Sequence, residues 1–136
     1  MPSTDLKQLA FALDHLKACK GYSPKFIDGK TSISTSLLSS KQLKLLPTVD
    51  GNKKGHLHYT SFSVLYNKKR KAPFFSASNI DLSKKNENTK RASTFVIDPR
   101  VKDSFQLNKS FYDLEKKITE FEIGHLASND EMSWGD

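Results

Sequence analysis

The first apolar pattern along the chain has a helical period. Leu9, Leu13 and Leu16 recur every three or four positions among polar residues, which places them on one face of an amphipathic helix. Gly21 follows this stretch and favours its termination. The pattern therefore predicts a helix over residues 5–19, packed on the domain through its apolar face.

A shorter helix is indicated further along. Ser39 and Gln42 stand three residues apart, as in a capping box, and Pro47 disfavours helix in the residue before it. We therefore expect a short helix that begins after Ser39 and ends with Leu46. The stretch between the two helices, residues 21–36, is polar and rich in turn-forming residues, which indicates a loop or a short hairpin.

The period then changes from helical to alternating. Residues 57–66 and 73–80 read as strands, and the basic stretch 67–71 between them predicts a hairpin turn. Residues 93–98 predict a third strand, and the apolar face of residues 110–118 predicts a short helix. The expected fold class is α+β, with an antiparallel sheet flanked by helices.

Length and composition fit one soluble domain. The chain has 136 residues, of which 36% are hydrophobic and 27% charged, and this allows a modest core. No apolar run is long enough for a transmembrane helix, and the first residues lack the basic and apolar regions of a secretory signal. We expect a cytoplasmic protein by default, or a secreted one if a leader has been removed. Cys19 is the only cysteine, so no intrachain disulfide can form.

Charge points towards polyanions without identifying one. The net charge is +7, which favours encounter with nucleic acid. The densest basic run is Lys68–Lys71, and taken alone it is better explained as a solvated hairpin tip than as a phosphate contact. Arg91 and Arg100 differ from this run, because a planar guanidinium can hold phosphate oxygens in a bidentate manner.

Several motifs follow in a definite order along the second half of the chain. They are Phe62–Tyr66, Lys69-Arg70, Ala77–Asp81, Arg91, Asp98–Val101, Gln106, Tyr112 and Glu122–Ala127. In this order the set resembles the DNA/RNA non-specific endonucleases, the endonuclease G-like enzymes of the ββα-metal group, whose signature reads roughly Asp-Arg-Gly-His. The ordered set is more specific than any single motif. It indicates that residues 57–136 are the first part of an endonuclease domain, preceded by an N-terminal helical and loop segment at 1–56.

The resemblance implies a role for each matching residue. His125 would be the general base that takes a proton from the attacking water, Glu122 would support the geometry around it, and Arg91 would hold the phosphate. Further substrate contacts are expected from Arg100, Lys69 and Arg70. Family members hold one divalent ion, usually Mg²⁺, and the implied substrate is DNA or RNA without strong sequence preference.

Three features depart from the family's pattern. Ile123 stands where an arginine normally precedes Gly-His, and it cannot donate to a phosphate. Glu122 stands where the family has aspartate. The family's metal-binding asparagine lies on a helix well beyond the histidine, so no metal ligand is assigned and the nuclease is expected to be incomplete in this chain, and inactive alone. The alternative function is a non-catalytic nucleic-acid-binding or interaction module derived from such a nuclease.

The expected incompleteness also bears on partners. Met132 and Trp134 would normally pack under the helix that follows the histidine segment. Without that helix we expect them to be exposed, which favours self-association or association with a separate C-terminal half.

Overall fold

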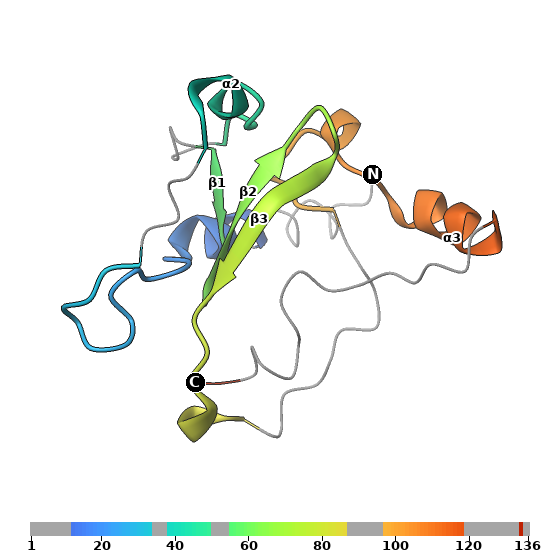
Figure 1. Cartoon of the computed structure of the whole chain (residues 1–136). Coiled ribbons are helices and arrows are strands. Elements are labelled where there is room, and N and C mark those ends of the chain that lie inside the picture. The colour runs from blue at the N-terminus through green and yellow to red at the C-terminus, as the bar shows by residue number, and fades with distance from the viewer. Residues whose placement is uncertain (1–11, 34–37, 50–54, 87–96, 119–133, 135–136) are drawn as a thin grey trace.

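The computed structural model describes residues 12–33, 38–49, 55–86, 97–118 and 134. It shows a three-stranded antiparallel sheet with helices around it (Figure 1), which confirms the α+β fold class. The strands are β1 (His56–His58), β2 (Phe62–Asn67) and β3 (Ala72–Ser78). The helices are α2 (Ser40–Leu43), α3 (Lys109–Ile118) and the short 3₁₀ helices η1 (Leu82–Lys84) and η2 (Asp103–Phe105).

The strands lie in the sheet in the order in which they occur in the chain. β2 is central and pairs antiparallel with β1 on one side and β3 on the other. Residues 59–61 form a turn between β1 and β2, where the Tyr59 N–H donates to the Phe62 carbonyl at 2.9 Å. The prediction of one continuous strand over residues 57–66 is therefore wrong, because the chain reverses direction within it.

The hairpin predicted between the next two strands is confirmed, with its turn between β2 and β3. The strand predicted at residues 93–98 is not present in its described part, residues 97–98. Its first four residues lie outside the described ranges, and the last two, Ile97 and Asp98, have no regular structure. In the described sheet, β1 supplies the third strand instead.

A small core lies against the sheet. It contains Val49, Leu57, Val64 and Val101, all at most 4% exposed. Half-buried aromatic residues pack against it: Tyr59, Phe62, Tyr66 and Phe105. Val49 precedes the sheet and Val101 follows it in the chain, so segments on both sides of the strands contribute to one core.

The short helix α2 forms by the local interactions that its sequence predicts. The Ser39 hydroxyl accepts from the Gln42 N–H, and the Gln42 side chain accepts from the Ser39 N–H at 2.9 Å, so both bonds of a capping box are present. The helix ends at Leu43 and a turn continues to Leu46. The prediction of a capped helix here is confirmed, although the helical part is shorter than expected.

The other two predicted helices are also present. Residues 12–18 are helical and form the described part of the helix predicted at 5–19. α3 matches the helix predicted at residues 110–118, and Figure 1 shows it projecting from the sheet. Its apolar residues are largely exposed, with Leu114 at 56% and Ile118 at 71%.

Candidate active site

A nearly buried ion pair lies beside the sheet. Arg100 Nη2 is 2.7 Å from Asp98 Oδ2, and the two side chains are only 4% and 10% exposed. Arg100 Nη1 donates to the carbonyl of His58 at 2.7 Å and to that of Leu16 at 3.2 Å. The guanidinium thus joins the first helix, β1 and the segment that begins at Asp98. These guanidinium donors are bonded to groups of the protein itself. Contact between Arg100 and a substrate stays a prediction.

Tyr59 completes the surroundings of this pair. Its hydroxyl donates to Asp98 Oδ2 at 2.7 Å, the Arg100 guanidinium carbon lies 4.8 Å from its ring centroid, and its ring stacks on Phe62 at 4.4 Å. Burial, followed by the nearby Asp98 charge, raises the pKa of Tyr59. The tyrosine is therefore neutral near physiological pH and acts here as a hydrogen-bond donor.

Both members of the ion pair stay charged. Burial opposes the ionisation of Asp98, but hydrogen bonds from Arg100 and Tyr59 outweigh it, so the pKa of Asp98 lies below its usual value. Burial likewise opposes the charged form of Arg100, but its bonds and attraction to Asp98 leave the pKa of Arg100 raised. A buried charge of this kind is tolerated because its partner is in place.

Gln106 locks the turn that carries the pair. Its side-chain oxygen accepts from the Asp98 N–H at 2.7 Å, and its amide nitrogen donates to the carbonyls of Asp98 (2.9 Å) and Val101 (2.7 Å). Two motifs that are separate in the sequence, Asp98–Val101 and Gln106, therefore form one structural unit. This unit anchors the chain just after the segment that contains Arg91.

A second anchor lies at the end of β3. Trp134 Nε1 donates to the Asn79 carbonyl at 3.0 Å, and Trp134 forms an isolated antiparallel bridge with Lys85. Its ring packs on Phe26 with centroids 5.4 Å apart. The buried Asn79 side chain is held in turn by Ser23, whose N–H donates to Asn79 Oδ1 at 2.6 Å. Trp134, which follows the Glu122–Ala127 motif in the sequence, thus lies against the end of the sheet.

This contact corrects one expectation. Trp134 was expected to be exposed, but it is half-buried and has both a ring contact and a hydrogen bond. Met132 lies outside the described residues. Self-association, and association with a C-terminal half, stay predictions.

The basic hairpin tip has a fixed backbone. Asn67, which is 2% exposed, accepts hydrogen bonds through Oδ1 from the N–H groups of Lys69 (3.0 Å) and Arg70 (3.1 Å). Lys71 completes the turn with a positive φ of 55°. The Lys69 and Arg70 side chains are exposed. They are thus available to a ligand from solvent.

A histidine–serine pair on β1 and β2 was not signalled by the sequence. His58 Nδ1 lies 2.8 Å from Ser63 Oγ, which also accepts from the Tyr22 N–H at 2.8 Å. Burial, then the positive charge of Arg100, lowers the pKa of His58. The histidine is therefore neutral near physiological pH. Since Ser63 is already bonded to the backbone at Tyr22, the pair serves to dock the 20–23 segment on the sheet.

The three residues at the centre of the predicted chemistry, Arg91, Glu122 and His125, lie outside the described residues. Within the described ranges, no three His, Cys, Asp or Glu side chains are grouped so that they could hold a metal ion. No Mg²⁺ ligand is therefore assigned among the described residues. In the same ranges no helix is long and apolar enough to cross a membrane.

Comparison with known proteins adds one finding. The model of the DNA/RNA non-specific endonuclease family matches residues 45–136. No curated protein and no solved structure shows significant similarity to the chain. The matched range begins within the turn after α2, includes the whole sheet and both anchors, and extends over the Glu122–Ala127 motif.

Proposed function

Because the chain belongs to the DNA/RNA non-specific endonuclease family, whose model matches about two thirds of it, we propose that it is a metal-dependent endonuclease. In this proposal it hydrolyses phosphodiester bonds of DNA or RNA, with His125 as the general base. The observation that carries the proposal is the family match itself, since it includes the Gly-His motif. Family membership indicates a nucleic-acid substrate.

The chemistry needs a base that is neutral at physiological pH. An imidazole meets this requirement, because its usual pKa lies near neutrality. His125 would take the proton of the attacking water, and Glu122 would orient the ring. Arg91 would hold the phosphate and offset the negative charge that grows on it in the transition state.

The described anchors support a common site for these residues. Lys85 and Trp134 are joined by a bridge at the end of β3. Arg91 follows Lys85 by six positions, and His125 precedes Trp134 by nine. Both segments therefore start from one point of the fold, and the intervening residues are long enough to let Arg91 and His125 reach the same phosphate.

Mg²⁺ is part of the proposal only through the family. When bound, such an ion supplies positive charge that stabilises the leaving oxygen. The chain's own residues are proposed to supply the base and the phosphate contact. The lack of strong sequence preference follows from the nature of the contacts, since charged side chains that bind phosphates do not read base identity.

Plasmid cleavage tests this function. Two forms are assayed: the chain alone, and the chain joined to the C-terminal region of a family member that carries the metal-binding asparagine. We call the second form the extended chain. We expect the extended chain to nick plasmid with Mg²⁺, to stop on addition of EDTA, and to lose about a hundredfold to ten-thousandfold in rate on His125→Ala. An extended chain that folds but does not cut, or that cuts equally well without His125, would refute the proposal.

A second candidate is a nucleic-acid-binding module without catalysis. Ile123 favours it, because this residue replaces an arginine that could contact phosphate. The same assay distinguishes the two functions. Duplex binding by an extended chain that never cuts would support the second candidate.

A further inference from the structure

Two stretches of the chain carry positive charge and no negative charge. Residues 38–49 and 55–80 contain six Lys and Arg residues and no Asp or Glu. The six are Lys41, Lys44, Lys68, Lys69, Arg70 and Lys71. The ion pairs seen in the described ranges, Arg100–Asp98 and Lys84–Asp81, involve none of them. A group of like charges raises the local positive potential.

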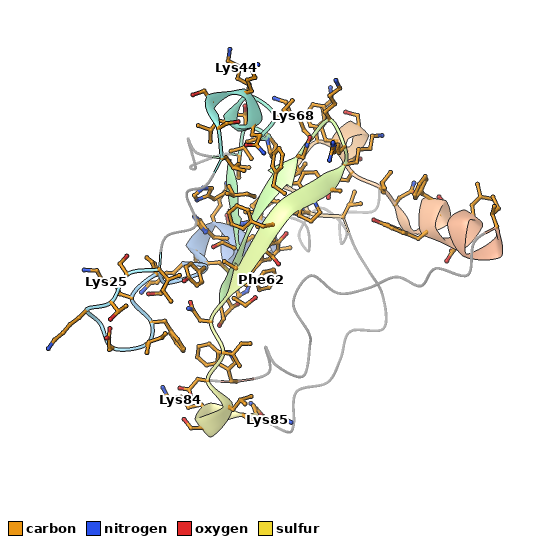
Figure 2. The ribbon with its side chains drawn as sticks, viewed as in Figure 1. Lys25, Lys44, Phe62, Lys68, Lys84 and Lys85 are labelled. Carbon is orange, nitrogen blue, oxygen red and sulfur yellow. The ribbon has the colours of Figure 1, made fainter. Side chains whose placement is uncertain are left out.

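The fold brings the two stretches together. The Lys68 N–H donates to the Leu45 carbonyl at 3.0 Å, which ties the start of the hairpin turn to the turn after α2. Figure 2 shows Lys44 and Lys68 at the same end of the sheet, while Lys25, Lys84 and Lys85 lie elsewhere. We call the cations of α2 and its C-cap (Lys41 and Lys44), together with those of the hairpin tip (Lys68 to Lys71), the α2–hairpin surface.

The backbone under this surface is held in place on both sides. The capping box of Ser39 and Gln42 fixes the start of α2. On the other side, Asn67 holds the hairpin tip through bonds to two successive N–H groups, those of Lys69 and Arg70. A fixed array loses less conformational entropy when it binds a ligand.

We propose that the α2–hairpin surface binds the phosphate backbone of duplex nucleic acid, with Lys41 and Lys44 as phosphate contacts in addition to the hairpin cations. The inference rests on the proposed function, since it takes nucleic acid as the ligand. It goes beyond the family match, because Lys41 and Lys44 precede the matched range. A duplex fits the surface because its backbone presents closely spaced negative charges to several cations at once.

Salt-dependent binding tests the proposal. A labelled DNA duplex is titrated at several salt concentrations with the full chain carrying His125→Ala, so that no cleavage occurs. The test variant adds Lys41→Gln and Lys44→Gln, and the matched control adds Lys25→Gln and Lys30→Gln instead. All four lysines are exposed, and both variants lose the same net charge. Circular dichroism verifies that each variant is folded.

We expect the slope of log K against log salt to become less negative by about 0.9 for each lost phosphate contact, or by about 1.8 for the test variant. The control should keep the slope of its parent. Equal slopes for the test variant and the control would overturn the proposal, as would a parent that does not bind the duplex at low salt.

The cleavage assay separates this inference from the proposed function. If the extended chain cuts plasmid through His125 but the test variant and the control bind duplex equally well, the proposed function stands and the binding surface is refuted. If the surface binds duplex but the extended chain does not cut, only the catalytic proposal is refuted.

Discussion

Arg100 Nη2 and Asp98 Oδ2 lie 2.7 Å apart in a nearly buried ion pair. Two residues this close in sequence could pair without affecting the rest of the fold. Here the remaining donors of Arg100 reach the carbonyls of Leu16 and His58. The pair therefore joins three separate segments, and removal of one member would leave the other charge without its partner.

Replacement of Arg100 should be costly for stability. We expect Arg100→Ala to lower the free energy of unfolding by about 3–5 kcal/mol, because the Asp98 carboxylate would stay buried and unpaired. Urea denaturation followed by circular dichroism measures this loss. The matched control is Lys84→Ala, which removes a largely exposed partner of Asp81 and should cost only about 0–1 kcal/mol. Similar losses for the two variants would contradict the structural role of Arg100.

The same pair predicts a pH dependence. The pKa of Asp98 is lower in the folded protein than its ordinary value of 3.8. Its contribution to stability is therefore fully present above that ordinary value, and it is lost as the pH falls through the lower folded pKa. Asp98→Asn should remove this part of the acid destabilisation. Urea midpoints measured over the acidic range test it, and parallel curves for the two proteins would contradict it.

The parts of the fold that depend on local interactions could be predicted from the sequence. The capping box at Ser39 and Gln42 and the apolar face of α3 need only neighbouring residues to form. The turn at residues 59–61 was missed because apolar and polar positions alternate on both sides of it, in Leu57–Tyr59 and in Phe62–Val64. The alternation shifts phase at Thr60 and Ser61, two polar residues in succession, and this shift was the only local sign that the chain reverses.

The candidate site shows the same limit. The sequence singled out Arg100 for its chemistry, yet the ring of Tyr59 and the carbonyls of Leu16 and His58, which its guanidinium contacts, lie far from it in the chain. The long-range bond from the Lys68 N–H to the Leu45 carbonyl, which joins the hairpin to the turn after α2, is likewise a contact between distant parts of the chain. No spacing in the sequence indicates these contacts.

Gly21 allows the close approach of the 20–23 segment to the sheet. It has a positive φ of 74°, and a Cβ at this position would collide with Ser63 Oγ and His58 Nδ1. Gly29 has a similar φ of 71° with no atom within 4 Å of its Cβ position. Both alanine variants should carry backbone strain of about 1–3 kcal/mol, and Gly21→Ala should lose more because the His58–Ser63 contact must also move.

Thermal or urea unfolding of the two glycine variants tests this difference. The Gly29→Ala protein is the control, since it adds the strain of a positive φ without the collision. Equal stability of the two variants would show that the close packing of Gly21 on Ser63 contributes nothing.

Arg91 and Arg70 should affect cleavage in different ways. In the extended chain, we expect Arg91→Ala to lower the single-turnover cleavage rate by about a hundredfold to a thousandfold, because a donor placed on the reacting phosphate acts mainly in the transition state. Its effect on duplex affinity should be smaller. Arg70→Ala removes an exposed cation of the hairpin tip, so it should weaken binding and flatten the salt dependence by about 0.9 in slope.

The two variants serve as controls for each other. At saturating protein, the Arg70→Ala form should cut at nearly the rate of the parent, because the hairpin binds substrate in the ground state and the transition state equally. Arg91→Ala should stay slow at saturation. If saturating protein restores the rate of Arg91→Ala, this arginine contributes binding alone, and the proposed stabilisation of the transition state by Arg91 is wrong.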